Sequence, residues 1–197
     1  MLPDNLFTDP PIRPYAVKVP ITDTVSGEAM LAIDHQNIIG TQSDRFYRDG
    51  ASFDGDQFRL IDWATVVREL KNFFGPITSA MAFADWNHNA IYEADLVQSG
   101  VELVHAPDFP HKNVDFKMTA VTVARALSNP STKRVILLTH DGDFAHLADV
   151  LRASGRSVIC VGIREMGISR DLFKVCDAVY KISPTLPARR NCSYLHA

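Results

Sequence analysis

Short apolar segments alternate with amphipathic segments along most of this sequence, and this alternation is what most constrains the fold. Apolar runs typical of buried strands occur at residues 29–33, 78–84, 101–105, 134–139, 157–163 and 178–182. Segments with helical spacing of their apolar residues lie between them, at 63–74, 90–99, 114–127, 144–151 and 169–175. Strands of five to seven residues that alternate with helices indicate βαβ units. The sequence therefore predicts an α/β fold with a mainly parallel central sheet.

Three segments fall outside this alternation. Residues 1–28 are rich in proline and have no sustained periodicity, so we predict an extended N-terminal arm. Residues 40–56 are rich in Gly, Ser and Asp, which predicts a long surface loop inserted into the domain. Residues 183–197 lack periodicity and predict a C-terminal tail. One domain, from 29 to 182, remains.

Composition excludes several classes of protein. The three cysteines do not suggest a disulfide framework or a zinc ribbon, and no apolar run is long enough to span a membrane. Without a signal-peptide pattern, cytoplasmic residence is expected. The net charge of −3 hides an asymmetry: residues 1–110 carry 7 basic and 16 acidic side chains, and residues 111–197 carry 13 and 7. The second part could therefore meet a phosphate backbone, but the chain is not a broadly cationic coat for nucleic acid.

Acidic residues stand where the strands of a parallel sheet would end. Asp34 ends the first predicted strand, and Asp141 and Asp143 follow the fourth. Asp115 lies in the first turn of the helix after the third strand. Parallel sheets place their sites at the carboxyl ends of strands where the strand order reverses, and the first and fourth strands are expected neighbours there. We therefore predict that the four carboxylates share one cleft.

Four carboxylates in one cleft would repel one another, and a hard divalent cation relieves this repulsion. Mg²⁺ or Mn²⁺ suits an all-oxygen donor set better than zinc does. Metals held in this way are suited to phosphodiester hydrolysis by activated water. Three of the four acids also have a structural alternative: Asp143 as a helix N-cap, Asp115 as a partner of the helix dipole, and Asp34 as a surface loop residue.

Several motifs, taken in order, resemble the NYN domain of the PIN-like nuclease superfamily, including its LabA-like bacterial branch. The motif positions are Asp34 and Asn37, Lys112 and Asp115, Asp141-Gly142-Asp143-Phe144, Gly155 to Val158, Ser169 to Leu172, and Asp177. The resemblance covers about residues 29–182. It implies a three-layer α/β/α sandwich of the PIN-like kind and metal-dependent ribonuclease activity.

The resemblance also implies roles for individual residues. Asp34, Asp115, Asp141 and Asp143 would be the catalytic and metal-binding acids. Asn37 would be the polar residue adjacent to the site and Lys112 a contact to the phosphate, both as substrate-binding residues. The family has Ser-Gly before the acid pair, whereas this chain has Thr139-His140. Thr139 can replace the serine hydroxyl.

Some side chains keep two interpretations. His140 either touches the substrate or is a surface imidazole without a role. Ser169 and Arg170 either bind phosphate or form a plain helix start, with Ser169 as the N-cap. Trp86 either stacks on a base or packs under a loop.

The sequence thus predicts a Mg²⁺- or Mn²⁺-dependent endoribonuclease that cuts single-stranded or loop RNA, acting alone or as a homodimer. The alternative is an RNA-binding or regulatory module that keeps the fold without turnover. A small-molecule phosphatase ranks last, because the sequence has no Asp-x-Asp-x-Thr motif.

Overall fold

The computed structural model describes residues 14–18, 27–39, 61–107, 113–163 and 167–182. The predicted loop at 40–56, the predicted tail at 183–197 and the candidate Lys112 lie outside these ranges.

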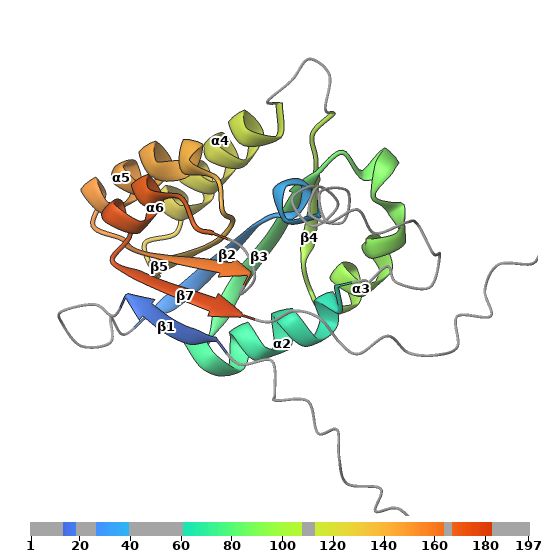
Figure 1. Ribbon diagram of the computed structural model, residues 1–197, viewed down its shortest axis with the longest axis horizontal. Helices are drawn as coiled ribbons and strands as arrows, with labels where there is room; N and C mark the ends of the chain where they lie inside the picture. Colours follow the sequence, from blue (N-terminus) through green and yellow to red (C-terminus); the bar gives the residue numbers. More distant parts are fainter. Residues whose placement is uncertain (1–13, 19–26, 40–60, 108–112, 164–166, 183–197) are drawn as a thin grey trace, which may run out of the picture.

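A seven-stranded sheet forms the centre of the molecule (Figure 1). The strands are β1 (Tyr15–Lys18), β2 (Glu28–Asp34), β3 (Ile77–Ala84), β4 (Glu102–His105), β5 (Thr132–Leu138), β6 (Ser157–Ile163) and β7 (Ala178–Ile182). Their order is β1-β7-β6-β5-β2-β3-β4, and only β1 runs antiparallel to its neighbour. The predicted α/β fold with a mainly parallel sheet is confirmed.

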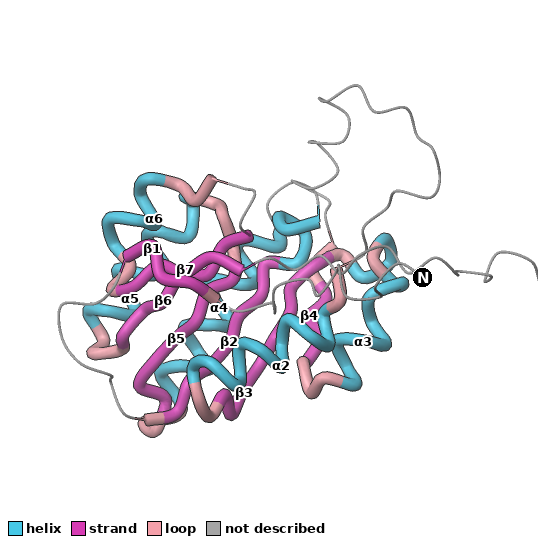
Figure 2. Tube along the Cα trace, turned by 60° about the horizontal axis from the view of Figure 1, so that its bottom comes forward, coloured by secondary structure: helices cyan, strands magenta, loops and turns pink. Residues whose placement is uncertain are grey.

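Helices cover both faces of the sheet (Figures 1 and 2). They are α2 (Trp63–Phe74), α3 (Glu93–Gln98), α4 (Asn113–Ser128), α5 (Ala145–Ala153) and α6 (Arg170–Val175). The described residues also form three 3₁₀ turns: η1 (Trp86–His88) and η2 (Ala90–Tyr92) lie between β3 and α3, and η3 (Gly142–Phe144) lies between β5 and α5. The helices α2 and α3 pack on one face, and α4, α5 and α6 pack on the other. The result is a three-layer α/β/α sandwich.

Each central strand is buried on both faces because its successive side chains point to opposite sides of the sheet. In β2, Leu31 and Ile33 join the core under α2, while Met30 and Ala32 join the core under α4. A strand of this kind needs apolar residues at every position, which is why it appears in the sequence as a continuous apolar run.

The strand order reverses between β2 and β5, as predicted. These strands pair in parallel, and Ile33 lies opposite Leu138. The residues that follow each strand therefore emerge side by side at the carboxyl edge of the sheet. This pairing brings Asp34 beside the segment that begins at Thr139.

The end of the sheet differs from the prediction. Residues 15–18, within the predicted arm, form β1, which pairs antiparallel with β7. The segment 178–182 forms β7, which therefore lies between β1 and β6 and not at the edge of the sheet. Four residues give too short a pattern to separate a strand from an extended arm.

Candidate functional site

Asp34 ends β2 as a buried carboxylate, only 1% exposed, which excludes its alternative as a surface loop residue. The Thr139 hydroxyl donates a hydrogen bond to its Oδ2 at 2.8 Å, and the Asn37 backbone N–H donates to its Oδ1 at 3.2 Å. The pKa of Asp34 is raised to about 7, mainly by burial; the hydrogen bonds from Thr139 and Asn37 oppose the shift, and the charges of Asp115 and Asp141 contribute to it. A carboxylate placed in this way is stabilised by a nearby cation.

The segment after β5 folds back on the same hydroxyl group. The Asp141 backbone N–H donates to Thr139 Oγ1 at 3.2 Å. The Thr139 hydroxyl therefore contacts both Asp34 and the acid loop, the segment 141–143 that carries Asp141 and Asp143. Asp141 Oδ1 accepts the Asp143 N–H at 2.9 Å and caps η3. The N-cap is therefore Asp141, and the alternative that assigned this role to Asp143 is wrong. Thr139 is fully buried, so its hydroxyl positions acids and does not face solvent.

Three acids from two helical segments come together at this edge of the sheet. Carboxylate oxygens of Asp115, in the first turn of α4, and of Asp141 and Asp143 all lie within 4.8 Å of one another. Asp34 lies close enough to Asp115 and Asp141 for their charges to raise its pKa. The four predicted acids are thus neighbours, and their all-oxygen donor set fits a hard divalent cation such as Mg²⁺ or Mn²⁺.

His140 occupies the interior, so the prediction of a surface imidazole is wrong. The residue is 7% exposed, and its Nε2 accepts the Ile163 backbone N–H at 2.8 Å. Its own backbone N–H donates to Asn37 Oδ1 at 3.3 Å. The ring lies beside Gly162, where an added Cβ would be 3.3 Å from His140 Cδ2. His140 therefore links β6 to the turn that carries Asn37.

Ser169 and Arg170 begin the short helix α6. The Ser169 hydroxyl accepts the Asp171 N–H at 3.2 Å, which makes it the N-cap, and its backbone N–H donates to the His140 carbonyl at 3.2 Å. A Cβ on Gly142 would lie only 2.5 Å from Ser169 Oγ, so the acid loop passes close to this helix start. The N-cap interpretation of Ser169 is confirmed, while phosphate binding by this pair stays a prediction.

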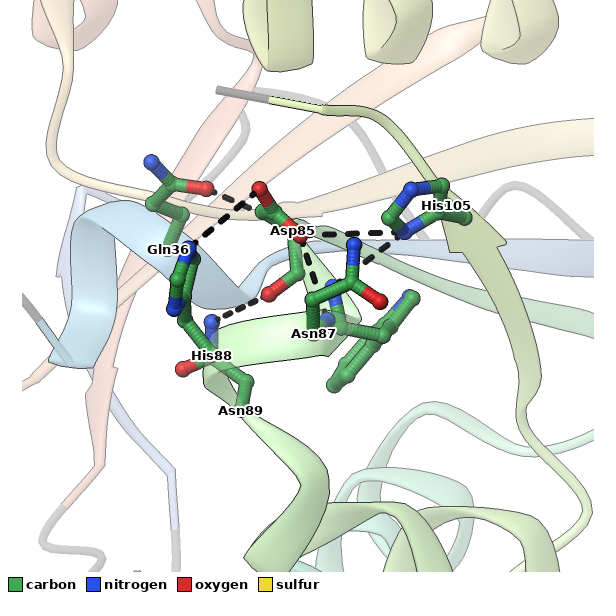
Figure 3. Close-up of polar contacts among 7 residues, drawn as sticks. Gln36, Asp85, Asn87, His88, Asn89 and His105 are labelled. Atoms are coloured by element: carbon green, nitrogen blue, oxygen red, sulfur yellow. Dashed lines mark hydrogen bonds and ion pairs between the residues drawn. The ribbon is translucent and has the colours of Figure 1, made fainter. Parts of the chain in front are cut away.

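A second polar cluster follows β3 at the same edge of the sheet (Figure 3). Asp85 is 7% exposed, and its Oδ1 accepts the Asn87 N–H at 3.1 Å. Its backbone N–H donates to Gln36 Oε1 at 3.2 Å, which ties β3 to the helical turn after Asp34. The imidazoles of His88 and His105 stand 3.9 and 4.0 Å from its carboxylate. The sequence analysis did not predict this cluster, although Asp85 directly follows a predicted strand, as Asp34 does.

Aromatic rings surround His35, the residue after Asp34. Its ring centroid lies 5.3 Å from that of Trp63, 4.9 Å from that of Trp86 and 4.9 Å from that of Tyr92. Burial lowers the pKa of His35 to about 3. Within the described residues, neither ring nitrogen has a hydrogen-bond partner. Trp86 is buried, so its packing interpretation is confirmed.

Asp177, the last acid of the motif series, lies at the opposite edge of the sheet. Its Oδ2 accepts the Val158 N–H at the start of β6 at 2.8 Å, and its Oδ1 accepts Arg152 Nε at 2.9 Å. These contacts give Asp177 a structural role, and they separate it from the four acids at the carboxyl edge.

A mainly parallel sheet covered on both faces, with an acidic centre where the strand order reverses, is the arrangement of a PIN-like nuclease domain. The sequence pattern of the NYN domain matches residues 28–183, so the chain belongs to the NYN domain family of the PIN-like nuclease superfamily. No curated protein is significantly similar to the chain.

A solved structure supports the fold. The crystal structure of a protein of unknown function from Vibrio parahaemolyticus is similar to the chain, with a TM-score of 0.61 and 19% sequence identity. The similarity covers 82% of this chain and 96% of the Vibrio chain. Within the part of the chain that the structure describes, no helix is both long and apolar enough to cross a membrane.

Proposed function

We propose that this protein is a metal-dependent endoribonuclease that hydrolyses phosphodiester bonds of single-stranded or loop RNA. The observation that carries the proposal is the meeting of Asp115, Asp141 and Asp143 within 4.8 Å beside the buried Asp34. Membership of the NYN family supports a nuclease and RNA as the substrate class. Free, buried Cys160 and Cys176 agree with a reducing compartment, and we place the protein in the cytoplasm.

The four acids would have different positions in the metal site according to how buried each carboxylate is. Asp34 is buried and held by two hydrogen bonds, so it would be a fixed ligand deep in the site. Asp143 is exposed and would complete the donor set on the solvent side, where substrate arrives. Mg²⁺ or Mn²⁺, when bound there, would activate water and neutralise charge on the phosphate. Asn37, Lys112 and Arg170 are proposed to contact the RNA backbone.

Grouping these carboxylates is costly without a cation, because each charge disfavours the others. The Thr139 hydroxyl and the backbone N–H groups around it hold the acids in place in spite of this repulsion. Such an arrangement is what electrostatic preorganisation for catalysis requires. A module that only bound RNA would have no use for it.

The test is cleavage of end-labelled single-stranded RNA with Mg²⁺ or Mn²⁺, comparing wild type with Asp141→Asn. The matched control is Asp149→Asn, an exposed acid on α5 away from the strand ends. We expect Asp141→Asn to lower the rate at least roughly 100-fold, since even outer-shell changes cost 10–100-fold in metal affinity or activity. EDTA should abolish cleavage, and the control should cut normally.

The result also decides the alternative. Tight RNA binding without cleavage under either cation would show a binding module. Equal activity of Asp141→Asn and wild type would overturn the proposed site.

A further inference from the structure

Phe116 is an exposed aromatic side chain in the first turn of α4, with 71% of its surface open to solvent. The helix buries Val114, Met118, Thr122 and Ala126, which repeat every four residues and face the sheet. Phe116 lies two positions from both Val114 and Met118, so it points away from this face. Its ring therefore adds nothing to the core of the protein.

Phe116 differs from the two other exposed phenylalanines that the structure describes, Phe73 and Phe173. The Phe73 ring packs edge-on against the rings of Phe74 and Tyr180, with centroids 4.8 and 5.3 Å away. The Phe173 ring has the Lys18 ammonium over it, 5.7 Å from its centroid. Among the described residues, Phe116 has no ring or cation contact of either kind. Within the described part of the chain, its ring faces therefore remain open to solvent.

The position of Phe116 connects it to the acidic centre. It directly follows Asp115, whose carboxylate lies within 4.8 Å of Asp141 and Asp143. Neighbouring helical residues rise by only about 1.5 Å along the axis, so both side chains leave the same turn of α4. Lys117, the next residue, is also exposed and adds a positive charge to the same end of α4.

We propose that Phe116 is a substrate-positioning residue that stacks on an unpaired RNA base next to the phosphate held at the acidic centre. This inference rests on the proposed nuclease function. Every base has an aromatic face, so stacking of this kind tolerates sequence. It requires a base that is free of its partner, as in single strands and loops. The ring would thus select unpaired RNA, and the acids would act on its backbone.

The experiment measures the affinity of a fluorescein-labelled single-stranded RNA by anisotropy in Ca²⁺, together with cleavage of the same RNA in Mn²⁺. The variants are Phe116→Ala, Phe116→Tyr and the matched control Phe73→Ala, an exposed ring on the opposite face of the sheet. We expect Phe116→Ala to weaken binding about 5- to 140-fold, the equivalent of roughly 1–3 kcal/mol of stacking per base. Phe116→Tyr keeps the aromatic face and should bind like wild type, as should Phe73→Ala.

A fully paired RNA duplex of the same sequence is the second arm. Phe116→Ala should change its affinity little, because paired bases cannot stack on the ring. Equal single-strand affinity of Phe116→Ala, Phe73→Ala and wild type would overturn the inference, even if all three cut RNA and the nuclease function stands. Ring-dependent binding without any cleavage would support stacking and refute the nuclease. The exposed position predicts unchanged thermal unfolding for Phe116→Ala, which excludes a folding defect.

Discussion

Replacing Thr139 by valine tests how the acidic centre is held together. Valine has nearly the same shape as threonine but no hydroxyl. The change removes the 2.8 Å hydrogen bond to Asp34 Oδ2 and the acceptor for the Asp141 N–H at 3.2 Å. Thr139 is fully buried, so water cannot easily replace either bond. Thr139→Ser keeps the hydroxyl and is the matched control.

The expected loss follows from the number and kind of these bonds. A hydrogen bond to a charged group contributes roughly 1.5–3 kcal/mol, and 1.4 kcal/mol corresponds to a factor of ten. The bond to Asp34 alone therefore predicts a loss of about 10- to 140-fold in affinity for Mn²⁺. This range agrees with the 10–100-fold cost of removing an outer-shell partner of a metal ligand.

Isothermal titration of Mn²⁺ into each variant at pH 8 measures the effect. Thr139→Val should bind 10- to 140-fold more weakly by the estimate of about 1.5–3 kcal/mol, and Thr139→Ser should stay within about threefold of wild type. Circular dichroism should show that both variants fold. If valine and threonine bind Mn²⁺ equally, the hydroxyl does not hold Asp34, and the assigned role of Thr139 fails.

Three further changes test other contacts. His35→Phe should raise the free energy of unfolding by about 1–3 kcal/mol at pH 7.5, because it removes buried nitrogens without partners. The pKa of His35 in the folded protein is about 3, below the ordinary 6.5, so wild type should lose stability as the pH falls from 6.5 toward 3. Denaturant titrations over this range should show that the stability advantage of His35→Phe over wild type grows. A variant that is less stable than wild type at pH 7.5 would contradict this expectation. Gly142→Ala should weaken Mn²⁺ binding because its Cβ would lie 2.5 Å from Ser169 Oγ, and adding Ser169→Ala should restore part of the affinity. Asp177→Ala should lower the melting temperature without changing Mn²⁺ affinity, because its carboxylate holds the Val158 N–H at the far edge of the sheet.

Much of the fold could be predicted from the sequence because strands buried on both faces leave a continuous apolar pattern. The segment 29–33 is predictable as a strand for this reason, and the position of α2 is predictable because the spacing of its apolar residues from Trp63 to Phe74 is regular. The strand β1 was not visible, because its four residues become a strand only through pairing with β7.

The candidate site was partly visible for a related reason. The acids after β2 and β5 stand out because charged residues directly follow apolar runs, and parallel strands place such positions at one edge. The surroundings of the acids were not visible. His140 looked like a surface residue in the sequence, yet it is buried because the Ile163 N–H and the space beside Gly162 receive its ring.

The sequence by itself determined the alternation of strands and helices and the positions of four acids relative to strand ends, since both depend on local patterns. Only the tertiary structure decided which polar groups lie buried together. Thr139 serves Asp34 and Asp141 at once, Asp177 stabilises the opposite edge, and the cluster around Asp85 unites three segments. Such contacts join residues up to 105 positions apart, and pairing of this kind depends on strand order, which no local pattern encodes.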